Sequence, residues 1–221
     1  MLTFMKNVKK VLGKDGAQSA IHYQKGRAYA SNRYSCIWVE DPSGREGAVD
    51  VKSNLAIEDA QIPDYSKILP ELRGNEPYAT ADADELAEFH AVLKAAIACA
   101  PGPRSVECVL MVWRADGLTA YVHDERLRAS YRFSGTIELL GLKGGQSFYA
   151  AFDARRLSDL VDYLRQRKAQ VRIYASASRR SPLRAEVNPD ITAAVPAGGL
   201  IAPLTRFEEE RFADVIPDSA E

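Results

Sequence analysis

The amino-acid sequence predicts an α+β fold in which helices line one face of antiparallel sheets. Three segments show the apolar spacing of amphipathic helices, and each is followed by several short runs with the alternation of β-strands. Tight turns separate the strands within each group, and no strand–helix–strand crossover is apparent, so a parallel Rossmann sheet is not expected. A helix followed by strands therefore occurs three times, which indicates a repeated half-domain.

The first helix is predicted over residues 2–13. Leu2, Met5, Val8 and Leu12 share one face because they are spaced three and four residues apart. Four lysines lie on other faces of the same segment: Lys6, Lys9, Lys10 and Lys14. Lysine stripes of this kind usually point into solvent, but they are also suited to contact phosphate groups.

A shortened first domain with its linker is predicted over residues 1–75. Short strands are expected at residues 20–23, 28–30, 36–40 and 48–51. The segment Ile62–Pro70 follows, with prolines near both ends and no helical period. Its apolar side chains either pack a domain junction or line a groove that other proteins bind. A proline-stiffened segment loses little entropy in forming such a groove.

A complete second domain is predicted over residues 76–206. Asp82 or Asp84 caps a helix that ends near residue 100, and Asp153 caps another helix. The remaining expected elements are a helix at 154–168 and strands at 106–113, 118–123, 126–133, 136–140, 147–152, 171–175, 183–187 and 200–204. An acidic tail, residues 207–221, is expected to be mobile.

Composition limits the class of protein. The 221 residues are 46% hydrophobic and 27% charged, as in ordinary globular proteins, and the net charge of −1 argues against a wholly basic nucleic-acid coat. A basic face balanced by an acidic one is still compatible with this value. No apolar run is long enough to span a bilayer and no signal peptide is apparent, so a cytoplasmic protein is expected.

No catalytic or metal-binding arrangement is apparent in the sequence. The cysteines at positions 36, 99 and 108 have neither metal-ligand spacing nor a disulfide pattern, so no metal or other cofactor is expected. His22, His90 and His123 lie far apart in sequence, and Gly141–Gly145 lacks the ending of a phosphate-binding loop. The protein is therefore not expected to be an enzyme.

Three stretches, taken in order, resemble the bacterial DNA sliding clamp, the beta subunit of the replicative DNA polymerase. They are Gly26–Val39, Ile62–Pro70 and Phe148–Leu164, the last being followed by Val171–Ile173 and Leu200–Leu204. This resemblance extends over most of residues 1–206.

The resemblance implies a processivity factor, a ring that encircles duplex DNA and binds a DNA polymerase and a clamp loader. Helices would line the ring, and their cations would contact phosphates without reading bases. The implied lumen residues are Lys6, Lys9, Lys10, Lys14, Lys94, Arg155, Arg156, Arg165, Arg167 and Lys168. The same resemblance implies a cleft for partner peptides, formed by Ser31, Asn32, Tyr34, Ser35, Cys36, Pro70, Leu200, Ile201, Ala202, Pro203 and Leu204.

The chain is short for this family, because it has room for a shortened domain and one complete domain. Four such chains would supply the six domains of a homo-oligomeric ring, and a trimer or a dimer stays open as the alternative assembly. The small size is also compatible with a phage-encoded protein.

The sequence departs from the family's pattern in both cleft segments. Arg33 and Ser35 stand where the family has glycine and arginine, and Ala202 and Leu204 stand where it has methionines. A second function therefore stays open, that of a clamp-like interaction or accessory protein that does not encircle DNA.

Overall fold

A computed structural model describes residues 1–12, 20–69, 78–100, 107–124, 126–134, 147–175, 178–188 and 195–216. The helices are α1 (Leu2–Val11), α2 (Tyr65–Ile68), α3 (Ala83–Cys99), α4 (Ala154–Arg165) and the 3-10 helix η2 (Glu209–Phe212). The strands are β1 (Ala20–Gln24), β2 (Arg27–Ser31), β3 (Ser35–Glu40), β4 (Gly47–Asp50), β5 (Tyr78–Ala81), β6 (Cys108–Arg114), β7 (Gly117–His123), β8 (Arg128–Arg132), β9 (Phe148–Asp153), β10 (Val171–Tyr174), β11 (Leu183–Val187) and β12 (Ala197–Ile201).

The strands form two antiparallel sheets, as predicted. The larger has eight strands in the order β4-β1-β2-β3-β12-β11-β10-β5, and the smaller has four in the order β8-β7-β6-β9. All the strand pairs of both sheets are antiparallel. The three predicted helices pack against these sheets, so the predicted fold class is confirmed.

The half-domain repeat is visible in the topology. Three units each consist of a helix followed by three antiparallel strands: α1 with β1–β3, α3 with β6–β8, and α4 with β10–β12. The second and third units exchange strands. β5, which leads into α3, pairs with β10 of the α4 unit, while β9, which leads into α4, pairs with β6 of the α3 unit. This reciprocal exchange joins the two units into one complete domain-like body.

The first unit is joined to the third along one pair of strands. β3 pairs with β12 from Ser35 opposite Ile201 to Val39 opposite Ala197, which makes the eight-stranded sheet continuous. Gly199 is essential to this close approach, because a Cβ there would lie 2.4 Å from Leu160 Cδ1 and 2.8 Å from the carbonyl oxygen of Cys36. A single hydrophobic core runs through all three units. The predicted division near residue 75 stays a prediction, since the sheet and the core continue from one part to the other.

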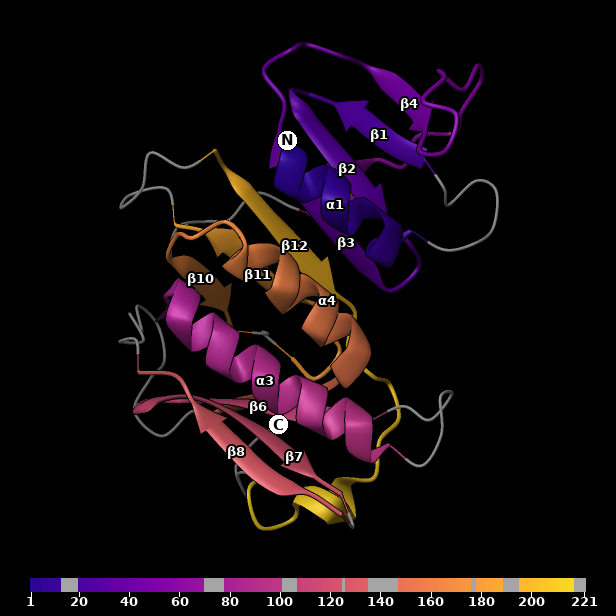
Figure 1. The fold of residues 1–221 in the computed structure, drawn as a ribbon. Coiled ribbons are helices and arrows are strands. Elements are labelled where there is room, and N and C mark those ends of the chain that lie inside the picture. The colour runs from indigo at the N-terminus through magenta and orange to yellow at the C-terminus, as the bar shows by residue number, and fades with distance from the viewer. Residues whose placement is uncertain are drawn as a thin grey trace.

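The helices form a layer on one face of the molecule (Figure 1). α4 lies between α1 and α3 and contacts both, while β1 and β4 extend beyond α1 and β7 and β8 extend beyond α3. Asp82 and Asp153 cap α3 and α4, since each carboxylate accepts hydrogen bonds from the second and third backbone N–H groups that follow it. The sequence predicted the cap of α4, and of the two candidates for α3 the structure selects Asp82.

Three predictions about local structure were wrong. The last strand is β12 at Ala197–Ile201 rather than residues 200–204, because Gly198 and Gly199 pair with β3 despite their low strand propensity. The proline-rich segment contains a helical turn, α2, which Asp64 caps. Residues 207–216 are packed rather than mobile, because Phe212 is buried against the outer face of the four-stranded sheet. The strand predicted at 136–140 lies outside the described residues.

Candidate nucleic-acid interface and outer cleft

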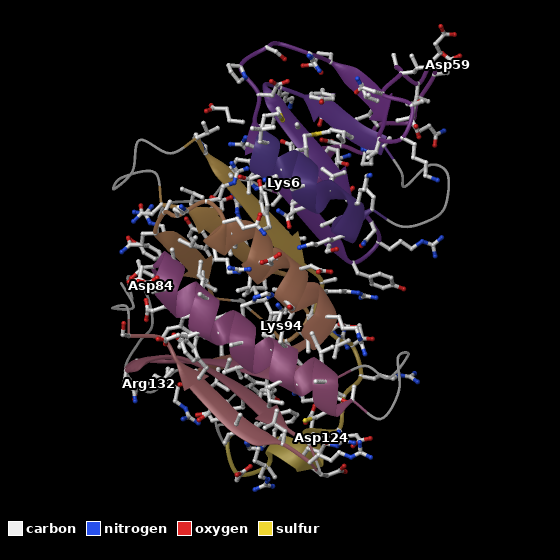
Figure 2. The ribbon with its side chains drawn as sticks, in the orientation of Figure 1. Lys6, Asp59, Asp84, Lys94, Asp124 and Arg132 are labelled. Carbon is white, nitrogen blue, oxygen red and sulfur yellow. The ribbon has the colours of Figure 1, made fainter. Side chains whose placement is uncertain are left out.

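The helix-bearing face carries cations of two kinds. Lys6 and Lys9 on α1 and Lys94 on α3 are exposed and have no ion pair with any described residue. Figure 2 labels Lys6 and Lys94 on this face, on separate helices. Arg155, in the first turn of α4, is partly exposed and likewise forms no ion pair within the described ranges. These four side chains are available to an anionic ligand.

The other cations of α1 and α4 are held by the protein itself. Lys10 and Arg165 both form ion pairs with Asp162 of α4. Burial alone would raise the pKa of Asp162, but the hydrogen bonds from Lys10 and Gln166 outweigh that effect and lower it to about 2. Asp162 is therefore ionised at neutral pH, and it joins α1 to α4 rather than leaving both cations free.

Two further arginines contact aromatic rings. The guanidinium of Arg156 lies 3.7 Å from the ring centroid of Tyr34, and Arg167 donates a hydrogen bond of 2.6 Å to the hydroxyl of Tyr163. Lys168 is exposed just beyond the end of α4. Lys14, the remaining member of the predicted lumen set, lies outside the described residues.

α3 contributes little positive charge to this face. Its exposed residues include Asp84 and Glu88 as well as Lys94, and several of the others are alanines. Free positive charge is therefore concentrated on α1 and at the start of α4. The sequence reasoning assigned only Lys94 to α3 and did not weigh Asp84 and Glu88 on the same helix.

Cys36 and Leu200 of the predicted cleft set lie on the opposite face of the eight-stranded sheet, whereas Leu204 packs against the four-stranded sheet. On the eight-stranded sheet, α2 packs over Tyr29, Cys36 and Trp38, together with Leu200 of β12. The connection between the first and third units continues past the strands, because the N–H of Ala202 donates to the carbonyl oxygen of Tyr34. The turn after β2 and the end of β12, which are distant in sequence, are thus brought together.

Tyr65 anchors α2 to this face. Its ring stacks on Tyr29 with centroids 4.0 Å apart, and its hydroxyl oxygen lies 2.6 Å from His22 Nδ1 and 2.8 Å from Ser31 Oγ. Burial lowers the pKa of His22, so the neutral imidazole is favoured in this polar contact. Sequence reasoning included Ser31 in the site but missed Tyr65 and His22. A tyrosine between two prolines is the signal that could have identified Tyr65.

The predicted cleft residues differ in accessibility. Tyr34 is 48% exposed, while Ser35, Leu200, Ala202, Pro203 and Leu204 are partly exposed. Asn32 organises the adjoining turn, because its side-chain oxygen accepts from the N–H groups of Tyr34 and Ser35. Cys36 is buried, and burial raises the pKa of its thiol to about 12.

One residue of the predicted cleft set does not line the outer face, and another cannot be placed. Ile201 is fully buried in the main core, so no ligand on the outer face can reach it. Pro70 lies outside the described residues. Ile68 of α2 is 37% exposed on this side and adds an apolar contact that the sequence reasoning did not assign.

A hollow of about 440 Å³ lies beside α2. Its lining includes Arg27, Tyr29, Glu40, Tyr65 and Leu69, so it combines aromatic walls with charges of both signs. The described residues contain no group of three or more histidine, cysteine, aspartate or glutamate side chains placed to hold a metal ion. No helix in the described ranges is long and apolar enough to cross a bilayer.

Solved structures with this arrangement of helices and sheets are bacterial sliding clamps. The Caulobacter crescentus beta sliding clamp superimposes with a TM-score of 0.66 at 15% identity, over 93% of this chain and 64% of the clamp chain. The beta subunit of DNA polymerase III from Thermotoga maritima gives 0.65 at 14% identity over the same fractions. That from Pseudomonas aeruginosa gives 0.64 at 11% identity, over 91% of this chain and 63% of that chain. The chain has a DNA-clamp fold.

The clamp fold is shorter here than in these structures. The chain spans about 64% of the length of the clamps it matches. No family model and no curated protein matches the sequence. At this level of identity the similarity establishes the fold, and the roles of individual residues have to be argued from the structure.

Proposed function

We propose that this protein is a shortened DNA sliding clamp, a processivity factor whose helix layer faces duplex DNA. The observation that carries this proposal is the continuous layer of α1, α4 and α3 on one face, with Lys6, Lys9, Lys94 and Arg155 available on it. Long flexible cationic side chains on helices that cross a duplex attract phosphates and contact no base edges. Such a surface holds DNA weakly at any one position and lets the protein slide.

The proposed ring is a homo-oligomer closed partly through strand edges. β8 is an edge strand of the smaller sheet and occupies the place in its unit that β12 occupies in the third unit. β12 already pairs with β3, so pairing of β8 between copies would repeat a contact that the chain makes internally. The number of copies proposed is four, with three as the alternative.

The outer face is the proposed docking site for a DNA polymerase and a clamp loader. Tyr34, Ile68, Leu200 and Ala202 form partly exposed apolar surface around the α2 anchor. Extended peptides with apolar anchors bind such surfaces through a few buried side chains. The small side chain of Ala202 favours a bulky anchor on the partner.

A second candidate function follows from the charge of α3. Asp84 and Glu88 are exposed on the same helix as Lys94, so the net charge of the exposed α3 side chains is not positive. A clamp-like accessory protein that binds partners through the outer face without encircling DNA is the function favoured by this feature. Both candidates are non-enzymatic.

Charge reversal on the helix layer tests the proposal. The double variant Lys6→Glu and Lys94→Glu is compared with Lys67→Glu, which makes the same change on α2 of the outer face. Binding to a duplex is measured by fluorescence anisotropy over a range of salt concentrations, and retention is compared on closed-circular and linearised DNA of one sequence. The double variant should lose about two units of salt slope, one for each phosphate contact, while Lys67→Glu leaves the slope unchanged.

The comparison of closed-circular with linear DNA decides between the two candidate functions. A ring that surrounds DNA is retained at high salt on the closed circle and slides off the linear form. Equal release from both DNA forms, or a salt slope that the double variant does not alter, would overturn the ring proposal in favour of the accessory protein.

A further inference from the structure

A strand followed by an aspartate cap occurs three times in the chain. β5 leads to Asp82, which caps α3, and β9 ends at Asp153, which caps α4. β4 ends at Asp50, whose Oδ1 accepts hydrogen bonds from the N–H groups of Lys52 and Ser53 at 3.0 and 2.7 Å. The second and third N–H groups after the aspartate are thus bound in all three places. Asp50 therefore makes the hydrogen bonds of a helix cap in the first unit, although a turn and not a helix follows it.

The chain makes a single turn after this cap. The N–H of Asn54 donates to the carbonyl oxygen of Asp50 at 2.8 Å, and Asn54 has a φ of 58°. A residue in the left-handed region at this position is a common way for a helix to end. The chain then runs back along β4, where Ala56 bridges to Val49, and goes on to α2. β4 thus holds the place in the first unit that β9 holds in the second, because each pairs with the first strand of its unit and ends at an aspartate cap. After β9 the helix α4 follows, whereas after β4 only a single turn follows.

The place of the absent helix is bordered by apolar side chains. Met1, Met5, Val8 and Leu12 lie along one flank of α1, because they recur at spacings of four and three. Helical geometry puts this flank opposite Asn7 and Lys10, the residues through which α1 bonds to α4.

This flank is partly open. Met1 and Met5 are 42% and 38% exposed, and Leu12, Val49 and Val51 are partly exposed at the edge of the core. Exposed methionines beside aliphatic side chains form an adaptable surface for an amphipathic helix.

The helix layer shows what kind of neighbour is absent. α4 is flanked by α1 on one side and by α3 on the other, and α3 is its partner within the complete domain-like body. Among the described residues, α1 has α4 as a helix neighbour but has no helix in the position that α3 holds beside α4. The wall of helices is therefore incomplete at the flank of α1.

We infer that the open flank of α1 binds the same flank of α1 in a second copy of this chain. Two units of the same kind already pack helix against helix within the chain, as α3 and α4 do, so the first units of two copies can form the corresponding pair. The contact is isologous, since each copy offers the same stripe to the other. In each copy β4 already pairs with β1, so the two first units can come together without a rearrangement of either sheet.

The stoichiometry of the proposed ring supports a second copy over an unrelated helical partner. Two first units make one complete domain-like body, so two chains supply three bodies and four chains supply six. In this respect the inference rests on the proposed function, because only a closed ring requires a whole number of complete domain-like bodies. The open flank of α1 and the repeated unit support the contact without the ring.

Charge on α1 gives the contact a salt dependence. Lys6 and Lys9 are exposed on α1 and no acidic residue lies in the helix, so two α1 helices repel one another at low ionic strength. Added salt screens this repulsion, and bound DNA would neutralise it. Self-association through α1 should therefore strengthen with salt, opposite to the behaviour of an association held by surface ion pairs.

The test compares Met5→Glu with Leu55→Glu in the full chain. Leu55 is 67% exposed, lies next to the isolated bridge between Ala56 and Val49, and is not a residue of α1. Both variants put a carboxylate in place of an exposed apolar side chain. Molar mass is measured without DNA by light scattering and sedimentation equilibrium at two salt concentrations, and circular dichroism checks the fold.

The expected result is that Met5→Glu halves the molar mass, or raises the dissociation constant roughly tenfold or more, because a buried carboxylate is costly. Leu55→Glu should keep the mass of the native protein. An unchanged mass for Met5→Glu, equal losses in both variants, or a native protein that is monomeric throughout would overturn the inference. Failure of the proposed function looks different: Lys6→Glu with Lys94→Glu would then leave DNA binding unchanged, whatever the mass of Met5→Glu.

Discussion

The hydroxyl oxygen of Tyr65 lies 2.6 Å from Nδ1 of His22, although 43 residues separate them in sequence. The same oxygen lies 2.8 Å from Ser31 Oγ, so one hydroxyl joins α2 to β1 and β2. Tyr65 is 1% exposed, which makes these contacts costly to lose because water cannot replace them. The segment between the two prolines is thereby held against the sheet and borders the outer cleft.

Removing this hydroxyl should loosen α2. Tyr65→Phe keeps the ring stacked on Tyr29 but leaves His22 and Ser31 without their shared partner. We expect the free energy of unfolding to fall by about 1 to 3 kcal/mol, the usual cost of an unsatisfied buried polar group. Urea denaturation monitored by tryptophan fluorescence measures the change.

Tyr34→Phe serves as the matched control, because Tyr34 is 48% exposed and its contact with Arg156 is made through the ring. Its unfolding free energy should change by less than about 0.5 kcal/mol, as for most surface substitutions. Equal stabilities of the two variants would mean that the Tyr65 hydroxyl does not hold α2.

Local pattern predicted most of the helices and strands of this fold. The spacing of Leu2, Met5, Val8 and Leu12 located α1, and the strand alternation located β11 at its observed bounds. The pairing of β3 with β12 could not be predicted in the same way. It depends on Gly198 and Gly199, which read as turn residues locally and function as strand residues only because another strand and α4 approach closely.

The assignment of the cleft residues stays a prediction. The structure brings the turn at Ser31–Cys36 next to β12 and Ala202, but it distributes the side chains of the two segments over different clusters. Which lysines and arginines are free depends on acidic partners distant in sequence. Lys10 and Asp162 are 152 residues apart, so only the packing of α1 on α4 shows that this lysine is paired.

Two carboxylates one turn apart on α4 should respond oppositely to the same substitution. Burial raises the pKa of Asp159 to about 6, with Lys10 offsetting part of that effect, whereas Asp162 has its pKa lowered to about 2. The pKa of Asp159 is higher in the folded protein than in the unfolded chain, so its protonated form stabilises the fold. This stabilisation is present below the unfolded pKa of 3.8 and is lost as the pH rises through 6. The pKa of Asp162 is lower in the folded protein, so its ionised form stabilises the fold. This stabilisation is present above 3.8 and is lost as the pH falls toward 2.

Asp159→Asn should therefore stabilise the protein near neutral pH. Because the carboxyl is partly exposed and screened by solvent, we expect a gain of about 1 kcal/mol at neutral pH and none at about pH 4. Thermal unfolding at the two pH values measures both effects. Asp162→Asn, which removes the partner of Lys10 and Arg165, should instead lose about 1 to 3 kcal/mol at neutral pH. A loss of stability in both variants would contradict the assignment for Asp159.

The junction between the first and third units should not accept a methyl group at Gly199. The Cβ of Gly199→Ala would lie 2.4 Å from Leu160 Cδ1 and 2.8 Å from the Cys36 carbonyl oxygen, so α4 or β3 must move. We expect a loss of about 1 to 3 kcal/mol in the free energy of unfolding, as for other overpacked sites. Urea denaturation measures it.

Leu160→Ala tests the origin of that loss, because it removes one of the two clashing groups. In the double variant the two losses should be less than additive, since the shortened side chain makes room for the new methyl group. Strict additivity would show that Gly199 is needed for a reason other than its contact with Leu160.

The C-terminal segment should protect the outer face of the four-stranded sheet. Phe212 is fully buried, stacks on His123 with centroids 5.2 Å apart, and packs with Leu110 and Tyr149. The carbonyl oxygen of Arg211 also accepts a hydrogen bond from Nδ1 of His123. Phe212→Ala should lower the free energy that holds this segment by about 3 kcal/mol, the order expected for removing a buried phenyl ring.

The effect should be local, because these contacts lie at one edge of the molecule and the segment can open without unfolding the sheets. Limited trypsin digestion should cleave after Arg211 on the order of a hundredfold faster in Phe212→Ala, since proteolysis follows the population of the open form. Glu210→Ala, an exposed change two residues away, should leave the cleavage rate as in the native protein. Rapid cleavage of the native protein itself would mean that residues 207–216 are detached in solution, as the acidic sequence alone predicted.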